Sequence, residues 1–209
     1  MSTEPKQPMA VTAKEVKALR DKTGAGPLDC KKALEQHHGD MDAAAEYLRE
    51  KALKDGIKLQ GKGRRADEGV IGNYLHFDNR LAVIVEVNCE TDFVAATDQF
   101  KAFAKDIAMH IANMSPKYVK REDVPDDVVA AETRLQLERA LEEGKPEHIA
   151  EKIVAGRMNK WYEDIVLMEQ SFIKDDDKTV GQYLQETVAE VGETINIGRY
   201  QRFAIGGEG

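Results

Sequence analysis

Apolar residues in the first part of the chain recur at the three- and four-residue spacing of amphipathic helices. Breaks that contain glycine divide them into three short helices over residues 12–55. The first helix opens on "TAKE" (12–15), a capping box in which the Thr12 hydroxyl and the Glu15 carboxylate each cover an exposed backbone N–H. Gly56 is expected to end the third helix. So small a module buries little apolar area and is expected to lean on a partner or a neighbouring domain.

The pattern changes to that of a β-hairpin after residue 69. Two runs rich in β-branched and aromatic residues, "VIGNYLHF" (70–77) and "RLAVIVEVN" (80–88), flank the pair Asp78-Asn79, which is typical of a two-residue loop. The second run is apolar on both faces, which predicts a strand inside a sheet that helices cover. A last strand is predicted over residues 194–206.

Further helices are predicted between the hairpin and the last strand. Large apolar side chains at 3-4-4-3 spacing mark one of them over residues 96–114. Pro125 and Pro146 are each suited to the first turn of another helix, and Thr179 can cap the last one. The acidic segment 174–179 is expected to be a turn.

These patterns predict an α+β fold: an N-terminal three-helix module, then a core domain of about three antiparallel strands packed with helices. A chain of 209 residues suits one large or two smaller domains. The expected parts are a disordered start over 1–11, the helical module over 12–56, a basic linker over 57–69 and the α+β core over 70–206.

The corner between the second hairpin strand and the next helix leaves one question open. In "EVNCETDFVA" (86–95), Asp92 favours the start of a helix and the large ring of Phe93 follows it. One continuous helix would put Phe93 seven residues before Phe100, on the same buried stripe. Thr97 offers a second possible cap, and a helix that began there would leave Phe93 on a turn. The pattern allows both arrangements.

The composition argues against several kinds of partner. The chain is 42% hydrophobic and 33% charged, and no apolar stretch approaches the ~20 residues of a membrane helix. Its net charge is −8 and its one basic strip (57–65) is short, which makes a poor surface for direct nucleic-acid binding. The first eight residues lack the apolar region of a secretory signal, and two cysteines are too few for a disulfide framework. The cytoplasm is the expected location.

Motifs for catalysis or metal binding are weak. The segment "GIKLQGK" (56–62) fits the first positions of a P-loop, but Gly63 stands where the Mg²⁺-binding hydroxyl belongs, and a helix precedes the segment where a P-loop needs a strand. The histidines and cysteines lack the spacing of metal ligands, and no nucleophile elbow is present. We therefore expect no cofactor, no metal and no enzymatic activity.

Several segments together resemble bacterial elongation factor Ts. They occur in the order that this family shows, between about residue 10 and residue 206: "LRDKTGAGPLDCKKAL" (19–34), "EVNCETDFVA" (86–95), the long segment 144–180 and "INIGRYQRFAIG" (195–206). The resemblance implies a guanine-nucleotide exchange factor for elongation factor Tu, the GTPase that delivers aminoacyl-tRNA. It also implies that the helical module is ubiquitin-associated-like.

The resemblance implies that a few residues form a wedge, which inserts into the GTPase. Thr91, Asp92, Phe93 and Val94 match the family's working tip, in which Asp92 and Phe93 lie against the GTPase with the ring between two of its helices. His76 matches a histidine that joins the same wedge. Wedging is implied to displace the loops that hold the phosphates and Mg²⁺, and so to promote GDP release.

The resemblance also nominates contacts outside the wedge. Arg20, Pro27 and Leu28 match positions at which the helical module docks on the GTPase, although many relatives carry an apolar residue such as Met in place of Pro27. Val191 and Gly192 match a segment near the phosphate loop of the GTPase.

A single core copy, where long relatives carry two, indicates the short form and predicts a homodimer. Two rival functions stay open. The P-loop-like segment 56–62 would suit a nucleotide-binding enzyme, and the N-terminal module alone would suit a ubiquitin-type adaptor, which would leave residues 70–206 without a role.

Overall fold

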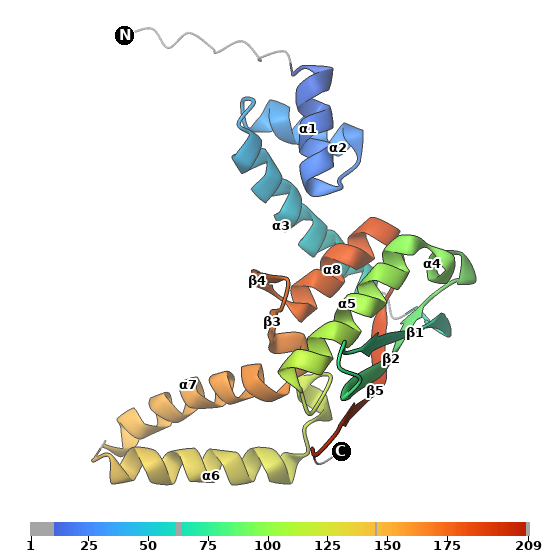
Figure 1. The fold of residues 1–209 in the computed structure, drawn as a ribbon. Helices are drawn as coiled ribbons and strands as arrows, with labels where there is room; N and C mark the ends of the chain where they lie inside the picture. The colour runs from blue at the N-terminus through green and yellow to red at the C-terminus, as the bar shows by residue number, and fades with distance from the viewer. Residues whose placement is uncertain (1–10, 62–63, 145, 208–209) are drawn as a thin grey trace, which may run out of the picture. The chain divides into compact units, whose positions relative to one another are not determined.

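The computed structural model of the protein describes residues 11–61, 64–144 and 146–207 (Figure 1). Helices and an antiparallel sheet form the predicted α+β fold. All but Val11 of the expected disordered start lies outside the described residues, as does Lys62 of the P-loop-like segment.

The described chain divides into two compact units. The first runs to Arg64 and also contains Gln185–Thr194, whereas the second comprises Arg65–Leu184 and the chain from Ile195 onward. The first unit is therefore built from two separate stretches of sequence.

The first unit contains the three predicted helices, α1 (Ala13–Thr23), α2 (Pro27–Gln36) and α3 (Met41–Gln60). The capping box of Thr12 and Glu15 opens α1, and Pro27 occupies the first turn of α2, where a missing N–H costs nothing. The side chain of Asp40 accepts two backbone N–H groups at the start of α3. These helices enclose a small core of Leu19, Cys30, Ala33, Leu34, Ala44 and Leu48.

The prediction that Gly56 ends α3 is wrong, because the helix continues to Gln60. Gly56 is buried, and a Cβ atom there would overlap the backbone carbonyl oxygen of Gln185 on α8 (Val180–Val191). The glycine thus allows two helices to approach closely within the first unit. Arg49 pairs with Glu186 at 3.4 Å in the same region. The expected linker over 57–69 is accordingly helical in its first residues.

The second unit is built on the sheet β1-β2-β5, with all neighbours antiparallel. Its strands are β1 (Glu68–Leu75), β2 (Leu81–Cys89) and β5 (Asn196–Ala204), so the hairpin and the last strand are both confirmed. The prediction of a two-residue loop is wrong, because β1 ends at Leu75 and β2 begins at Leu81. The Asp78-Asn79 pair lies in the longer turn between them, where Asn79 has a positive φ of 58° and donates its N–H to the His76 carbonyl oxygen.

Helix α5 (Asp98–Met114) covers one face of this sheet (Figure 1). The predicted stripe supplies the buried side chains Phe100, Phe103, Ile107 and Ile111. They face the alternate residues of β2 that are also buried, which include Val83 and Val85. Gly72 on β1 lets the helix come close, since a Cβ atom there would overlap the Ala104 carbonyl oxygen.

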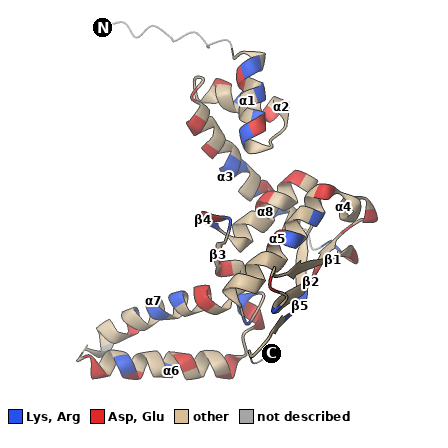
Figure 2. Cartoon of the chain, viewed as in Figure 1, with Lys and Arg blue, Asp and Glu red and all other residues tan. Residues whose placement is uncertain are grey.

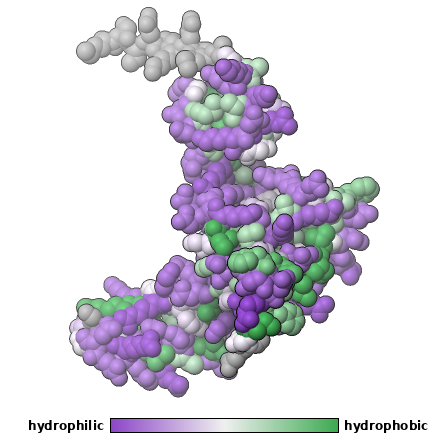
Figure 3. Space-filling model, in the orientation of Figure 1, coloured by the Kyte–Doolittle hydropathy of each residue, from purple (hydrophilic) through white to green (hydrophobic). Residues whose placement is uncertain are grey.

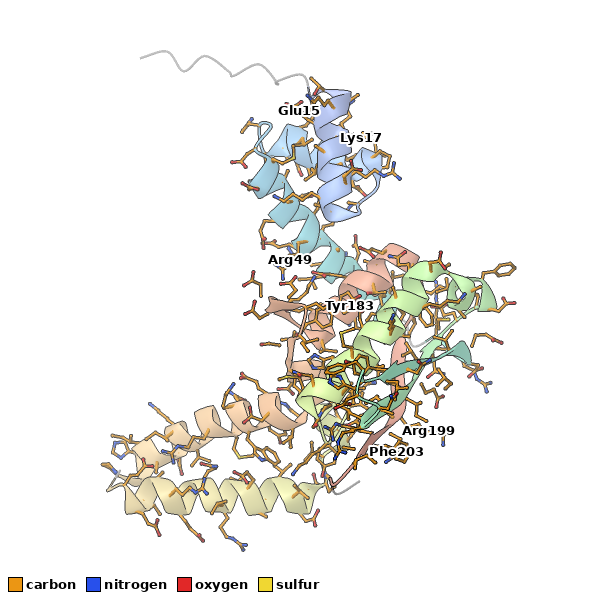
Figure 4. All side chains as sticks on the ribbon, in the orientation of Figure 1. Glu15, Lys17, Arg49, Tyr183, Arg199 and Phe203 are labelled. Carbon is orange, nitrogen blue, oxygen red and sulfur yellow. The ribbon has the colours of Figure 1, made fainter. Side chains whose placement is uncertain are left out.

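The other face of the sheet carries exposed apolar side chains, which we call the open face: Ile71, Leu75, Ile84 and Phe203. The register places Leu75 and Phe203 on either side of Ala82. Figure 4 labels Phe203 and Arg199 on β5, on the side of the sheet away from α5. Arg199 pairs with Glu86 at 3.2 Å, so this face carries both signs of charge.

Two long helices, α6 (Asp126–Glu142) and α7 (Glu147–Ile165), form an antiparallel hairpin (Figure 1). Both predicted helices are confirmed, and both signs of charge are spread along them (Figure 2). The base of the hairpin is a cluster around Val124, Ile165 and Val166. There Arg121, in the short 3-10 helix η1 (Arg121–Asp123), stacks on the Tyr162 ring at 4.1 Å and pairs with Glu169 of η2 (Leu167–Glu169).

The prediction of a simple turn over 174–179 is wrong. Asp175–Thr179 forms strand β4, which pairs with β3 (Ser171–Phe172). Acidic residues have low strand propensity, but pairing and burial of a neighbour override it. Phe172 is buried and its ring stacks on Tyr183 at 4.4 Å. Thr179 caps α8 as predicted, by accepting the Gln182 N–H at 3.1 Å.

Candidate functional site

The corner after β2 contains two helices that meet at Thr97. Helix α4 (Asp92–Ala96) comes first, and α5 begins at Asp98. Thr91 caps α4 by accepting the Val94 N–H at 3.3 Å. The backbone of Thr97 is extended, with φ −68° and ψ 147°, so the helix does not run through it. Of the two arrangements that the sequence allows, the later helix start is the one observed.

This geometry turns Phe93 outward. The side chain of Phe93 is 82% exposed, whereas Phe100, seven residues later, is fully buried. Asp92 beside it is exposed, Val94 is half-buried, and Ala95 is the residue with which α4 packs inward. The tip is therefore an exposed apolar projection with a carboxylate beside it.

His76 lies at the opposite end of the sheet from Phe93. The register pairs Leu75 with Ala82 at one end and Glu68 with Cys89 at the other. Steps of about 3.4 Å per residue make these ends about 24 Å apart. Within one chain, therefore, the structure does not bring His76 to Phe93.

The hairpin turn presents an aromatic ring that our reading of the sequence missed. Phe77 is 88% exposed and lies 4.4 Å from the His76 ring, centroid to centroid. The Tyr74 hydroxyl is 2.8 Å from Nδ1 of His76, which orients the imidazole. The sequence did indicate this exposed ring, because Phe77 stands directly before the Asp-Asn turn and side chains in turns are rarely buried.

The remaining predicted contacts belong to the first unit. Pro27 and Leu28 open α2, and both are exposed, as is Arg20 on α1. Val191 ends α8 and Gly192 follows it with a positive φ of 76°.

A close approach brings these two groups of residues together. A Cβ atom on Gly24, which ends α1, would lie 3.3 Å from the carboxylate of Glu190. The turn after α1 and the end of α8 are therefore neighbours within the first unit.

The described residues offer little for catalysis. No group of three or more metal-ligating side chains is found among them. Residues 56–60 of the P-loop-like segment are the last turns of α3, so they do not form a phosphate-binding loop after a strand. Cys30 and Cys89 are both buried thiols. Among the helices of the described chain, none combines the length and apolar character needed to cross a bilayer.

Comparison with known proteins identifies the family. The family model for "Elongation factor TS" matches residues 18–207. The chain is 52% identical over 198 residues to elongation factor Ts of Geobacter sulfurreducens, which covers 95% of this chain and 91% of that protein. It is 51% identical over 196 residues to the protein of the same name from Carboxydothermus hydrogenoformans, covering 94% and 89% of the two chains. The corresponding protein of Acetivibrio thermocellus is 52% identical over 196 residues, with 94% and 90% covered. The chain therefore belongs to the elongation factor Ts family.

Proposed function

We propose that this protein is the guanine-nucleotide exchange factor of elongation factor Tu and acts in translation elongation in the cytoplasm. Membership of the family supports the general role. The outward ring of Phe93 is the observation that carries the residue-level proposal. The protein has no reaction of its own to catalyse, and its effect falls on the nucleotide affinity of its partner.

The exchange mechanism needs only differential binding. Asp92 and Phe93 lie in α4, which Thr91 caps through the Val94 N–H, and they press between two helices of the GTPase. This contact fits best when the loops that hold the phosphates and Mg²⁺ are displaced, so binding of the wedge shifts the GTPase toward the form that releases GDP. An aromatic ring suits the task because it buries a large apolar area while ordering few rotatable bonds.

The first unit supplies a second contact with the same partner. Arg20, Pro27 and Leu28 dock on the nucleotide-binding domain of the GTPase, and Val191-Gly192 lie near its phosphate loop. The neighbouring positions of the turn after α1 and the end of α8 support a shared role. A tethered second contact raises the effective concentration of the wedge at its target.

The protein acts as a homodimer in this proposal. The single core copy and the apolar open face support it, and Figure 3 shows hydrophobic surface in the region of the sheet. The separation of His76 from Phe93 adds a reason, since a two-fold partner can bring its own His76 to the Phe93 of the first protomer. A complete wedge then needs two copies of the chain.

Phe93→Ala tests the function directly. The GDP-release rate of elongation factor Tu should fall strongly with this variant, because losing a central aromatic anchor commonly costs about 2 kcal/mol or more of interface free energy. The melting temperature should hardly change, because the ring is exposed in its own chain.

Two control variants bracket this result. Phe100→Ala removes a buried ring and should cost about 3–5 kcal/mol of stability. Leu135→Ala, an exposed apolar truncation on α6, should leave both the melting temperature and the exchange rate unchanged. Full exchange activity in Phe93→Ala would remove the wedge from the mechanism.

A further inference from the structure

The junction between α4 and α5 is held by two side chains. The Thr97 hydroxyl donates to the Val94 carbonyl oxygen at 2.7 Å and accepts the Phe100 N–H at 3.2 Å. Nζ of Lys101 donates to the Ala96 carbonyl oxygen at 2.7 Å. Both side chains are exposed, so neither is placed there by burial.

These hydrogen bonds replace one that a continuous helix would make. In an unbroken α-helix, the Phe100 N–H would bond to the Ala96 carbonyl oxygen four residues earlier. Here the Thr97 hydroxyl accepts the Phe100 N–H and Nζ of Lys101 donates to the Ala96 carbonyl oxygen, so the donor and the acceptor of that bond both have other partners. The break between the helices therefore leaves neither of these two backbone groups without a partner.

The break decides where Phe93 points. If α4 continued into α5, Phe93 would lie two turns before Phe100 on the stripe that faces the sheet. With the helix broken at Thr97, α4 packs through Ala95 and Phe93 is exposed.

We propose that Thr97 and Lys101 are positioning residues, which keep α4 separate from α5 and so present Phe93 to the GTPase. The effect on GDP release rests on the function proposed above, but the effect on the exposure of residue 93 does not. Neither residue needs to touch the partner. Thr97→Ala combined with Lys101→Met removes all three side-chain hydrogen bonds. The pair also favours the continuous helix, because Ala is a better helix former than Thr and Met is about as good as Lys.

The exposure of residue 93 can be measured in the isolated protein. The chain has a single tryptophan, Trp161, so a background of Trp161→Phe with Phe93→Trp reports on position 93 alone. Acrylamide should quench the fluorescence of this residue strongly when Thr97 and Lys101 are intact. In the Thr97→Ala, Lys101→Met background, quenching should fall and the emission maximum should shift to the blue, as for a buried indole.

The same pair of substitutions, with Phe93 retained, should slow GDP release from elongation factor Tu. We expect a loss of about fivefold or more, since loss of one threonine cap typically shifts a helix equilibrium by about that factor. Thr97→Ser, with Lys101 retained, keeps both hydrogen bonds of the hydroxyl. In this variant the exposure of residue 93 and the rate of GDP release should match those of the unaltered protein. Thr12→Ala removes the corresponding cap from α1 in the first unit and should leave the quenching unchanged.

Three results would overturn the proposal. Unchanged quenching in the double variant would mean that other contacts hold the break. Slower GDP release with residue 93 still exposed would mean that Thr97 or Lys101 contacts the GTPase directly. If the double variant does not fold, Lys101→Met alone should still lower the quenching, and an unchanged value would reject the role of Lys101. If the unaltered protein does not accelerate GDP release from elongation factor Tu, the proposed function fails, but the quenching comparison still decides the positioning role.

Discussion

His110 is a buried residue whose two ring nitrogens both have partners. Nδ1 accepts the Ile173 N–H at 3.2 Å, and Nε2 lies 3.0 Å from Oε1 of Gln170. The amide nitrogen of Gln170 donates to the Asp164 carbonyl oxygen, which orients the amide so that its oxygen accepts from Nε2. The imidazole is therefore neutral, with its proton on Nε2, and it ties α5 to the end of α7 and to β3.

A pH dependence of stability follows from this site. Burial lowers the pKa of His110 from its ordinary value of 6.5, and the hydrogen bond with Gln170 opposes that shift. Because the unfolded chain then binds the proton more tightly, stability is retained above pH 6.5 and is lost as the pH falls from 6.5 toward the lowered pKa. Melting temperatures at about pH 7.5 and about pH 5.5 should differ more for the unaltered protein than for His110→Gln, which cannot titrate. Equal differences in the two proteins would exclude His110 as the source.

The hairpin of α6 and α7 shows how an element can carry a residue that it does not need for packing. Gly156 is an exposed residue inside α7, and a Cβ atom there would meet nothing within 4 Å. Gly72 is the opposite case, because its Cβ atom would overlap the Ala104 carbonyl oxygen. The same residue type thus weakens a helix at one position and permits the packing of a helix on a sheet at the other.

Gly156→Ala should therefore stabilise the protein. Alanine is favoured over glycine inside a helix by about 1 kcal/mol, and there is space for the methyl group. Denaturant unfolding should show a higher midpoint with an unchanged slope. Gly72→Ala, the matched substitution, should lower the midpoint. A destabilised Gly156→Ala would indicate that the exposed face of α7 is covered in solution.

On the scale of the whole molecule, the open face is the surface that we propose a second copy of the chain covers. Ile84 lies on its central strand and is 49% exposed, with Ile71, Leu75 and Phe203 around it. The Glu86–Arg199 pair places both signs of charge on this face, so two copies can meet without net repulsion. A stable dimer should bury more than about 1,000 Å² in total.

We expect sedimentation at micromolar concentration to show a dimer, and Ile84→Glu to make it monomeric, because a carboxylate would be buried without a partner. Leu135→Glu on α6 is the matched control and should stay dimeric.

A mixture of Phe93→Ala and His76→Ala chains should regain exchange activity, since a mixed dimer keeps one site with both residues intact. A monomeric native protein, or a mixture no more active than its parts, would contradict the shared site.

Local patterns were sufficient for most of the elements. The capping box of Thr12 and Glu15, the hairpin before Cys89 and the apolar stripe of α5 were all predicted correctly, because each depends on residues a few positions apart. The motifs at residues 19–34 and 86–95 were likewise sufficient to identify the family, because such motifs are read from neighbouring residues without the fold.

Long-range contacts decided the rest. Gly56 resembles a helix stop, but its close approach to Gln185, more than a hundred residues later, makes it an interior residue of α3. The same pattern around Phe93 fits a buried and an exposed ring, and only the structure, in which α5 begins at Asp98, shows that the ring is exposed. The register of β1 on β2 sets His76 and Phe93 at opposite ends of the sheet. Spacing along the chain specifies which face of an element is apolar, whereas distances between elements arise only when those faces pack together.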